Sequence, residues 1–165
     1  AGIDSFKIEG RMKTALYVAT VARTYRKAID DYMESPELYR SNMEYYKSEI
    51  AKCTYRQFTT GFYFGKTDSD SQIYDNNTYI KNYTYIGNVQ LVTEDGLAVF
   101  EQKNKFSVGE MIEAMDFDGT NISCRVEEIY NDKMEKMESA PHPKMQLYVR
   151  LDRPVSAGMI LRRQE

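Results

Sequence analysis

The sequence predicts an α+β fold in which two N-terminal helices precede a small antiparallel β-barrel. Three observations support this prediction. Apolar residues recur at helical spacing in residues 11–33, and segments beyond residue 53 alternate as strands do. The pairs Asp95-Gly96 and Asp118-Gly119 separate consecutive strands and supply the positive φ that tight hairpins need. Short strands at hairpin spacing, with no helix between them, favour a closed barrel.

The first ten residues predict a short strand that ends in a turn. Ile3, Phe6 and Ile8 place apolar side chains in an otherwise polar stretch, and Gly10 follows. A strand needs a hydrogen-bonded neighbour, and none is predicted before residue 50. We therefore expect the chain to be part of a longer protein whose preceding region supplies that neighbour, and the absence of an initiator Met at Ala1 fits this expectation.

A long helix is predicted from Arg11 to Met33, a stretch without Gly or Pro. Its apolar residues form one stripe with spacings of three and four: Ala15, Val18, Ala22, Tyr25, Ile29 and Tyr32. A second row widens the apolar surface beyond the ~100° that one partner covers, which predicts a missing partner on one side: Met12, Leu16 and Ala19. Ser35 and Pro36 then predict the start of a second helix that runs to about Ile50.

The pattern divides the chain after residue 52, with the predicted helices in residues 1–52 and the predicted barrel in residues 53–165. Six segments of the second part predict strands: 61–65, 83–92, 97–100, 111–115, 122–126 and 146–151. Residues 66–82 predict a long polar loop. Its aspartates Asp68, Asp70 and Asp75 lack the glycine and the late glutamate of a calcium loop, so a solvated loop is the better interpretation.

Catalytic and metal-binding motifs are absent from the sequence. Cys53 and Cys124 are far apart, and the single histidine, His142, lies between two prolines, so a zinc site or a catalytic triad has no support. Two unpaired thiols suit a reducing cytoplasm, where each serves as a small buried hydrophobe. No apolar run is long enough to cross a bilayer and no leader opens the sequence, so we expect a cytoplasmic protein without catalytic or metal-binding residues of its own.

Charge argues against a nucleic-acid interface spread over the whole barrel. Residues 1–52 carry nine Lys and Arg against eight Asp and Glu, a net charge of +1, whereas residues 53–165 carry thirteen against seventeen, a net charge of −4. Local basic clusters could still contact phosphates or could be ordinary solvated surface: Lys103 with Lys105, and Arg150, Arg153, Arg162 and Arg163. Four aromatic residues could stack on bases if exposed, although barrel core suits about half of them: Tyr63, Phe64, Tyr83 and Tyr85.

Several motifs resemble the collagenase-like peptidase family U32. The stretch from Gly2 to Lys13, which continues to Asp30, resembles the segment that closes the catalytic region of that family. Further similar motifs cover nearly the whole chain: residues 60–65, 85–89, 104–110, 141–143 and 161–163.

This resemblance implies an upstream TIM-like barrel, a helical connection and a C-terminal β-barrel similar to the second domain of elongation factor Tu. It implies that residues 1–52 are the end of the catalytic region with its helical linker and that residues 53–165 are an accessory barrel. Members of the family resemble two kinds of enzyme, namely collagen-degrading proteases and hydroxylases of tRNA or ribosomal RNA. The hydroxylases use cysteines that bind an iron–sulfur cluster, in motifs upstream of residue 1. Cys53 and Cys124 match none of those motifs, so we expect no cofactor in this chain and assign the iron–sulfur cluster to the missing upstream region.

We predict that the chain is an accessory domain that binds or orients a protein or RNA substrate and is inactive alone. The predicted substrate-binding residues are Glu9, Arg11, Lys103, Lys105 and Arg150. Glu9 and Arg11 would lie at the carboxyl end of a barrel strand, or would pair with each other or cap a helix. The expected partner is the upstream barrel of the same parent chain. An alternative is a protein-interaction or dimerisation module built on residues 11–33; proteolysis by the chain itself has the least support.

Overall fold

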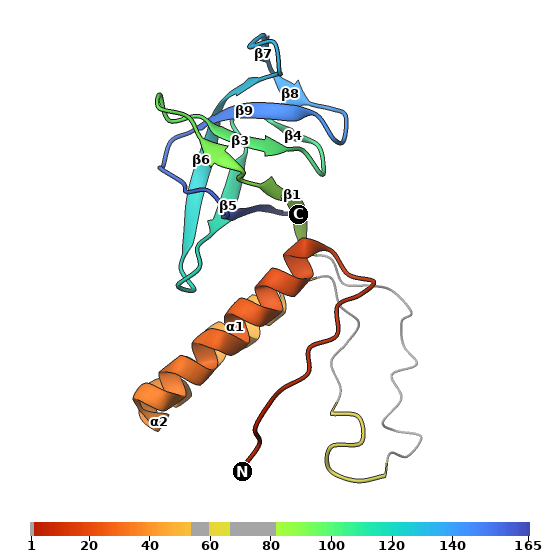
Figure 1. The fold of residues 1–165 in the computed structure, drawn as a ribbon, viewed down its shortest axis with the longest axis vertical. Coiled ribbons are helices and arrows are strands. Elements are labelled where there is room, and N and C mark those ends of the chain that lie inside the picture. Colours follow the sequence, from red (N-terminus) through yellow and green to blue (C-terminus); the bar gives the residue numbers. More distant parts are fainter. Residues whose placement is uncertain (1, 54–59, 67–81) are drawn as a thin grey trace.

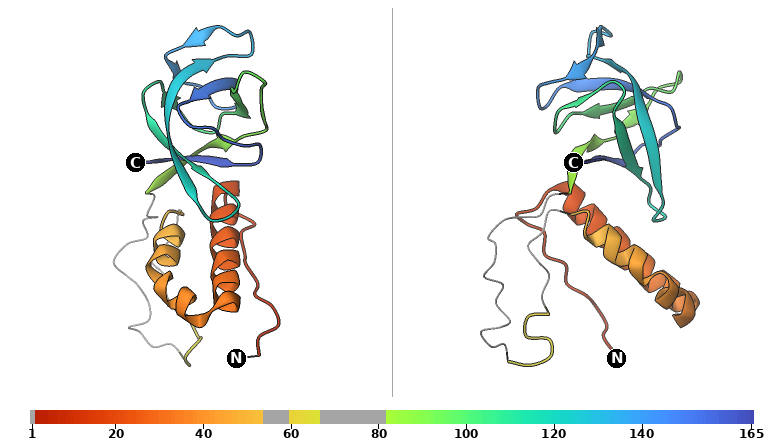
Figure 2. Two further views of the ribbon diagram at one scale, coloured as in Figure 1. Left: turned by 90° about the vertical axis from the view of Figure 1, so that its left-hand side faces the viewer. Right: turned by 180° about the vertical axis from the view of Figure 1, so that it is seen from behind.

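The computed structural model describes residues 2–53, 60–66 and 82–165. A helical hairpin lies below a barrel of antiparallel strands (Figure 1). The structure thus confirms an α+β fold in which the helices come first. The long helix starts at the barrel and runs away from it, the chain then reverses, and the C-terminus lies at the base of the barrel (Figure 2).

Helix α1 (Ala15–Glu34) begins four residues later than predicted because Thr14 is its N-cap. The Thr14 hydroxyl accepts a hydrogen bond from the backbone nitrogen of Tyr17, at 3.3 Å. The buried face of α1 is not the predicted apolar stripe but the row beside it: Leu16, Thr20, Val21, Thr24 and Asp31. Val18, Tyr25 and Tyr32 of the predicted stripe are 42%, 47% and 54% exposed, so much of the apolar face of α1 has no cover in the described residues.

The second predicted helix begins where expected but is divided into α2 (Pro36–Ser41) and α3 (Met43–Ile50). Ser35 caps α2, because its hydroxyl accepts from the backbone nitrogen of Leu38 at 3.0 Å. Asn42 separates the two helices, and its amide nitrogen donates to Asp31 Oδ2 of α1 at 3.0 Å. This contact ties the break between α2 and α3 to the buried side of α1.

Two predicted strands are wrong. Residues 2–10 contain no strand, and no described strand pairs with them. Residues 61–65 form turns instead, with the nitrogen of Tyr63 donating to the carbonyl of Thr60 at 3.0 Å. Three neighbouring aromatic rings are therefore exposed rather than packed on a sheet: Phe62, Tyr63 and Phe64. The predicted loop aspartates, Asp68, Asp70 and Asp75, lie outside the described residues.

The barrel is built from ten short strands in the described residues: β1 (Tyr83–Asn88), β2 (Leu91–Val92), β3 (Ala98–Glu101), β4 (Phe106–Ser107), β5 (Met111–Met115), β6 (Asn121–Tyr130), β7 (Lys136–Met137), β8 (Ser139–Ala140), β9 (Gln146–Leu151) and β10 (Ile160–Gln164). Every pairing between them is antiparallel. Seven strands follow the order β1-β10-β5-β6-β9-β3-β2, β7 pairs with β6, and β4 pairs with β8 in a separate two-stranded sheet. The β2–β3 and β5–β6 turns place Gly96 and Gly119 at positive φ, which confirms the two predicted turn glycines. Strand β10, between β1 and β5, was not predicted.

The sheet closes where β1 meets β3. The nitrogen of Lys103 donates to the carbonyl of Ile86 at 2.8 Å, and that of Gln90 donates to the carbonyl of Val99 at 2.8 Å. Gly87 permits this approach, because a Cβ atom there would lie 2.5 Å from Phe100 Cδ2. Inside the closed sheet, large apolar side chains from most strands form one core, including Ile86, Phe100, Phe106, Ile129, Leu147 and Leu161.

Candidate functional site

A cluster of buried charges joins the helices to the barrel. We call it the junction cluster: Arg23 of α1, Glu49 of α3, Lys52, Glu113 of β5 and Arg162 of β10. The side chain of Glu49 is 1% exposed and that of Arg162 is fully buried. Glu49 Oε2 accepts from Arg23 Nη2 at 2.6 Å and from Arg162 Nη2 at 2.9 Å. One carboxylate thus bridges α1, α3 and the barrel.

The remaining contacts of the junction cluster pair Lys52 and Glu113 with their neighbours. Lys52 Nζ lies 2.7 Å from Glu49 Oε1, and Arg162 Nε donates to Glu113 Oε2 at 2.6 Å. Burial raises the pKa of Glu49, but the hydrogen bonds and charges of Lys52 and Arg162 outweigh it and hold that pKa below its ordinary value. Glu49 is therefore ionised at neutral pH, and these charges stabilise one another within the protein.

The same helices also hold the β5–β6 turn, which reaches down beside α1 (Figure 1). Arg23 Nη1 donates to the carbonyls of Asp116 and Thr120, each at 3.0 Å. Tyr45 of α3 donates from its hydroxyl to the carbonyl of Gly119. Because both helices of the hairpin contact this turn, the helices and the barrel form one unit at this end of the junction.

At the other end of the junction, a groove of about 680 Å³ lies between the start of α1 and the barrel. We call it the junction groove. It is lined by Thr14 and Ala15 from α1 and by polar side chains from the barrel: Tyr85, Asn88, Gln90, Glu101, Lys103 and Asn104. Its volume falls in the range of about 300–1,000 Å³ typical of ligand pockets. Unlike the junction cluster, it is open to solvent.

Hydrogen bonds fix the barrel wall of the junction groove. The Tyr85 hydroxyl donates to Asn88 Oδ1 at 3.0 Å, and the Tyr85 carbonyl accepts from Asn104 Nδ2 at 2.7 Å. Burial raises the pKa of Tyr85 above its ordinary value, so the phenol is neutral at physiological pH. Lys103 forms an ion pair with Glu101 at the rim. The groove therefore offers an ordered aromatic ring, amides and one paired cation.

The predicted substrate-binding residues do not gather at one place. Lys103 lines the junction groove, and Lys105 follows it with an exposed side chain. Arg150 lies beyond the opposite end of the β3–β9 pairing, near Asp95 at 3.7 Å and Glu128 at 3.5 Å. At about 3.3 Å per residue, the four residues of β3 between these ends correspond to roughly 13 Å.

The other two predicted residues, Glu9 and Arg11, are exposed beside the start of α1. The backbone nitrogen of Arg11 donates to Glu9 Oε1 at 2.8 Å, so they contact each other, as in the alternative interpretation of this pair. Residues that the prediction missed are the groove amides Asn88, Gln90 and Asn104. Asn88 and Asn104 belong to quoted sequence motifs, but an amide side chain by itself gives no signal of a site.

The remaining basic and aromatic candidates are largely occupied by contacts within the protein. Arg162 belongs to the junction cluster, and Arg163 Nη1 donates to Glu110 Oε2 at 2.7 Å. The Tyr83 ring contacts two cations, with Arg162 Cζ at 5.1 Å and Lys52 Nζ at 5.3 Å from its centre. Tyr85 is the member of the aromatic set that lines the junction groove.

Neither cysteine is placed for chemistry. Both are free and buried, and burial raises the pKa of Cys53 and raises that of Cys124 to about 11. Thiolates are the form that binds metals, and the described residues contain no group of three His, Cys, Asp or Glu side chains that could hold a metal ion. The residues present therefore do not fit an iron–sulfur cluster. His142 is exposed on a turn.

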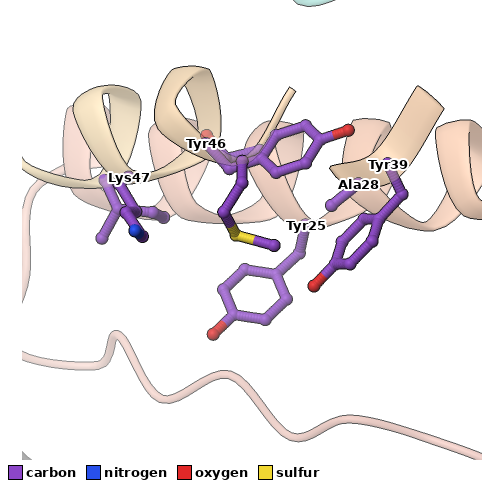
Figure 3. Close-up of a pocket in the computed structure, with 8 residues that line it drawn as sticks. Tyr25, Ala28, Tyr39, Tyr46 and Lys47 are labelled. Carbon is purple, nitrogen blue, oxygen red and sulfur yellow. The ribbon is translucent and has the colours of Figure 1, made fainter. Parts of the chain in front are cut away.

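A second hollow, of about 280 Å³, lies on the helical hairpin (Figure 3). Its walls are mainly apolar and come from both arms of the hairpin: Tyr25, Ala28, Tyr39, Met43, Tyr46 and Ile50. The segment before α1 passes below it in the view of Figure 3, and the Phe6 ring lies 6.5 Å from that of Tyr25. No helix in the described part of the chain is long and apolar enough to span a membrane.

Known proteins resemble the chain along most of its length. The model of peptidase family U32 matches residues 1–73, and that of the peptidase family U32 C-terminal domain matches residues 81–162. The tRNA hydroxylation protein P1 of Bacillus subtilis is 32% identical over 98% of this chain and 38% of its own length. The tRNA hydroxylation protein P of Escherichia coli is 36% identical over 85% of this chain and 30% of its own length.

A third relative has a different name. The collagenase of Porphyromonas gingivalis is 28% identical over 68% of this chain and 31% of its own length. Among solved structures, the C-terminal domain of a Geobacillus thermoleovorans protein described as a U32 peptidase is 22% identical, with a TM-score of 0.45. That alignment covers 48% of this chain and 99% of the other. The chain spans about a third of the length of these curated relatives, and it belongs to peptidase family U32.

Proposed function

We propose that this chain is the part of a U32 protein that binds or orients an RNA substrate, and that it catalyses no reaction alone. The observation that carries the proposal is the similarity to the tRNA hydroxylation protein P1, because it extends over 98% of this chain. The helices, the junction groove and the barrel therefore all lie in the shared region. The match to the collagenase is shorter and less identical, which favours RNA over protein as the substrate.

The chemistry of the described residues supports an accessory role. The two thiols are buried with raised pKa values, so neither is a nucleophile at neutral pH. The buried charges of the junction cluster are paired with each other and closed off from solvent, whereas the junction groove is a polar surface that a substrate could enter. The free thiols also suit a reducing cytoplasm, where RNA-modifying proteins act on their substrates.

The catalytic work is assigned to an upstream barrel of the same parent chain, which would also hold any iron–sulfur cluster. Residues 2–9 support this partner, because they are exposed, include the apolar side chains of Ile3, Phe6 and Ile8, and pair with no described strand. The apolar stripe of α1 supports it as well, since Val18, Tyr25 and Tyr32 are substantially exposed. An upstream barrel would supply both a neighbouring strand and a packing surface.

Binding of an unmodified tRNA transcript tests the proposal. We expect micromolar or weaker affinity that falls as salt is raised, since phosphate contacts release counterions. Reversing the charge of Lys103 and Lys105 together is expected to weaken binding more than reversing that of Arg150, because Arg150 lies at the opposite end of β3. Failure of the wild-type chain to bind tRNA would contradict the proposal, as would tRNA hydroxylation or gelatin cleavage by this chain alone.

A second candidate function is a protein-interaction or dimerisation module. The observation that favours it is the same exposed apolar face of α1, together with the hollow on the helical hairpin. Light scattering over a range of concentrations tests it. A dimer that is lost in a Tyr25→Ser, Tyr32→Ser variant would support this function, and a monomer at high concentration would count against self-association.

A further inference from the structure

Tyr85 is placed as a fixed platform at the junction groove. Its side chain packs against the small buried cluster formed by Leu16, Met115 and Ile160, and it also lines the groove. The hydrogen bond from its hydroxyl to Asn88 Oδ1 holds the ring, while the bond from Asn104 Nδ2 to its carbonyl holds the backbone. A ring that is already ordered loses little conformational entropy when a ligand stacks on it.

Three amide side chains around Tyr85 retain hydrogen-bonding capacity. Asn88 accepts through Oδ1, Asn104 donates through Nδ2, and Gln90 accepts through Oε1 from Gln146 at 2.9 Å. Among the described residues, no partner engages the other polar atom of these amides, namely Asn88 Nδ2, Asn104 Oδ1 and Gln90 Nε2. The groove thus presents donors and an acceptor beside an aromatic ring, which is the combination that reads the edge and face of an unstacked base.

The charge of the groove limits the kind of RNA that it suits. Lys103, the one cation among the described residues that line the groove, is paired with Glu101, and residues 53–165 carry a net charge of −4. A duplex, which is held mainly through its phosphates, would gain little here. An unpaired nucleotide held by stacking and by amides depends far less on bulk charge.

We propose that the junction groove is a subsite for one unpaired nucleotide of the RNA substrate, with the base stacked on Tyr85 and its edge read by Asn88, Gln90 and Asn104. This inference rests on the proposed RNA-binding function and adds the form of RNA and the residues that recognise it. The base lies between the start of α1 and β1, so both the helices and the barrel contribute to its binding.

Fluorescence anisotropy with a labelled short single-stranded RNA, a duplex of the same sequence and a tRNA transcript tests the subsite. Tyr85→Ala is expected to weaken binding of the single strand about tenfold or more, whereas Tyr85→Phe, which keeps the ring, stays within about threefold. Phe117→Ala is the matched control, because Phe117 is an exposed aromatic residue outside the groove, and it leaves affinity unchanged. The duplex binds more weakly than the single strand.

A second variant keeps the test decisive if Tyr85→Ala does not fold, as judged by its thermal unfolding. Asn88 and Gln90 are exposed, so Asn88→Ala, Gln90→Ala should fold normally and bind the single strand several-fold more weakly. If tRNA binds but the folded variants match the wild type, or the duplex binds as well as the single strand, the subsite is wrong and the proposed function stands. If the wild type binds no RNA at all, both fail.

Discussion

The two ends of the junction between helices and barrel use polar residues in opposite ways. At the junction cluster, Glu49 and Arg162 are almost completely removed from water and bonded to each other. At the junction groove, Asn88 and Gln90 are exposed and keep free hydrogen-bonding groups. The buried charges are bonded mainly to one another and are closed off from solvent, although Arg23 Nε and Arg162 Nη1 have no hydrogen-bond partner in the described residues, so the cluster fixes the geometry of the junction. Solvated amides can exchange water for a ligand, so the open end is the one suited to recognition.

The largest expected effect comes from removing one charge of the junction cluster. Glu49→Gln keeps the side-chain shape but leaves Arg23, Arg162 and Lys52 with one carboxylate fewer, so we expect the free energy of unfolding to fall by about 3–5 kcal/mol. Urea denaturation measures this change. The matched control is Glu44→Gln, because Glu44 pairs with Lys47 on the exposed surface and should contribute less than about 1 kcal/mol. Equal losses in the two variants would contradict the assigned role of the cluster.

A smaller loss is expected where the barrel closes beside the groove. Gly87→Ala would bring a Cβ atom to 2.5 Å from Phe100 Cδ2 and 3.0 Å from the carbonyl oxygen of Glu101. We expect the free energy of unfolding to fall by about 1–3 kcal/mol, as is typical of overpacked cores. Asn88→Ala at the neighbouring exposed position is the control. A Gly87→Ala variant as stable as the wild type would show that β1 and β3 can separate without cost.

The junction cluster, unlike the junction groove, is expected to make the stability of the protein depend on pH. The pKa of Glu49 lies below its ordinary value of 4.5, so the folded chain binds fewer protons at this group than the unfolded chain does. The stabilisation is present above pH 4.5 and is lost as the pH falls through the lower folded value. Burial raises the pKa of Asp31, but its hydrogen bonds with Tyr46, Asn42 and Lys27 outweigh burial and lower that pKa below its ordinary value. Asp31 therefore also stabilises the folded chain less as the pH falls.

Urea midpoints measured from neutral pH down to about pH 3 test this dependence. We expect the Glu49→Gln variant to lose less stability on acidification than the wild type, because one of the groups that must be protonated is gone. The groove variant Asn88→Ala should keep the wild-type dependence. Parallel curves for Glu49→Gln and the wild type would contradict the lowered pKa of Glu49.

The smallest expected effect concerns the rim of the groove. Lys103→Ala removes a cation that is already paired with Glu101, so we expect tRNA affinity to fall only a few-fold and the dependence of log affinity on log salt to flatten by at most about one. Arg150→Ala should change affinity less. Titrations at several salt concentrations measure both, and a larger effect of Arg150→Ala would place the RNA at the opposite end of β3.

Much of the fold was predictable because local signals agree with tertiary structure. Ser35 caps a helix as expected, and Gly96 and Gly119 make the predicted turns. The predictions of strands over residues 111–115 and 146–151 match β5 and β9. Strands β4, β7 and β8 have two residues each, too few for an alternating pattern to appear.

The site was predicted less completely. Lys103 and Tyr85 were candidates by residue type, but their proximity depends on closure of the sheet between β1 and β3. Strand β10 was not predicted because its two successive arginines, Arg162 and Arg163, suggest a solvated surface. In the structure Arg162 is buried beside Glu49. Residues 61–65 resemble a strand by composition yet form turns, since composition does not supply a neighbour to pair with.

The amino-acid sequence by itself determined the family, the placement of the helices before the strands, and several caps and turns, because these depend on spacing and on residues close together along the chain. Only the tertiary structure decided which face of α1 is buried, which charges pair, and that Tyr85 and the three groove amides meet. Glu49 and Arg162 are 113 positions apart, and no local pattern encodes such a contact. Ion pairing and burial at this distance arise only when the folded chain removes water from both partners.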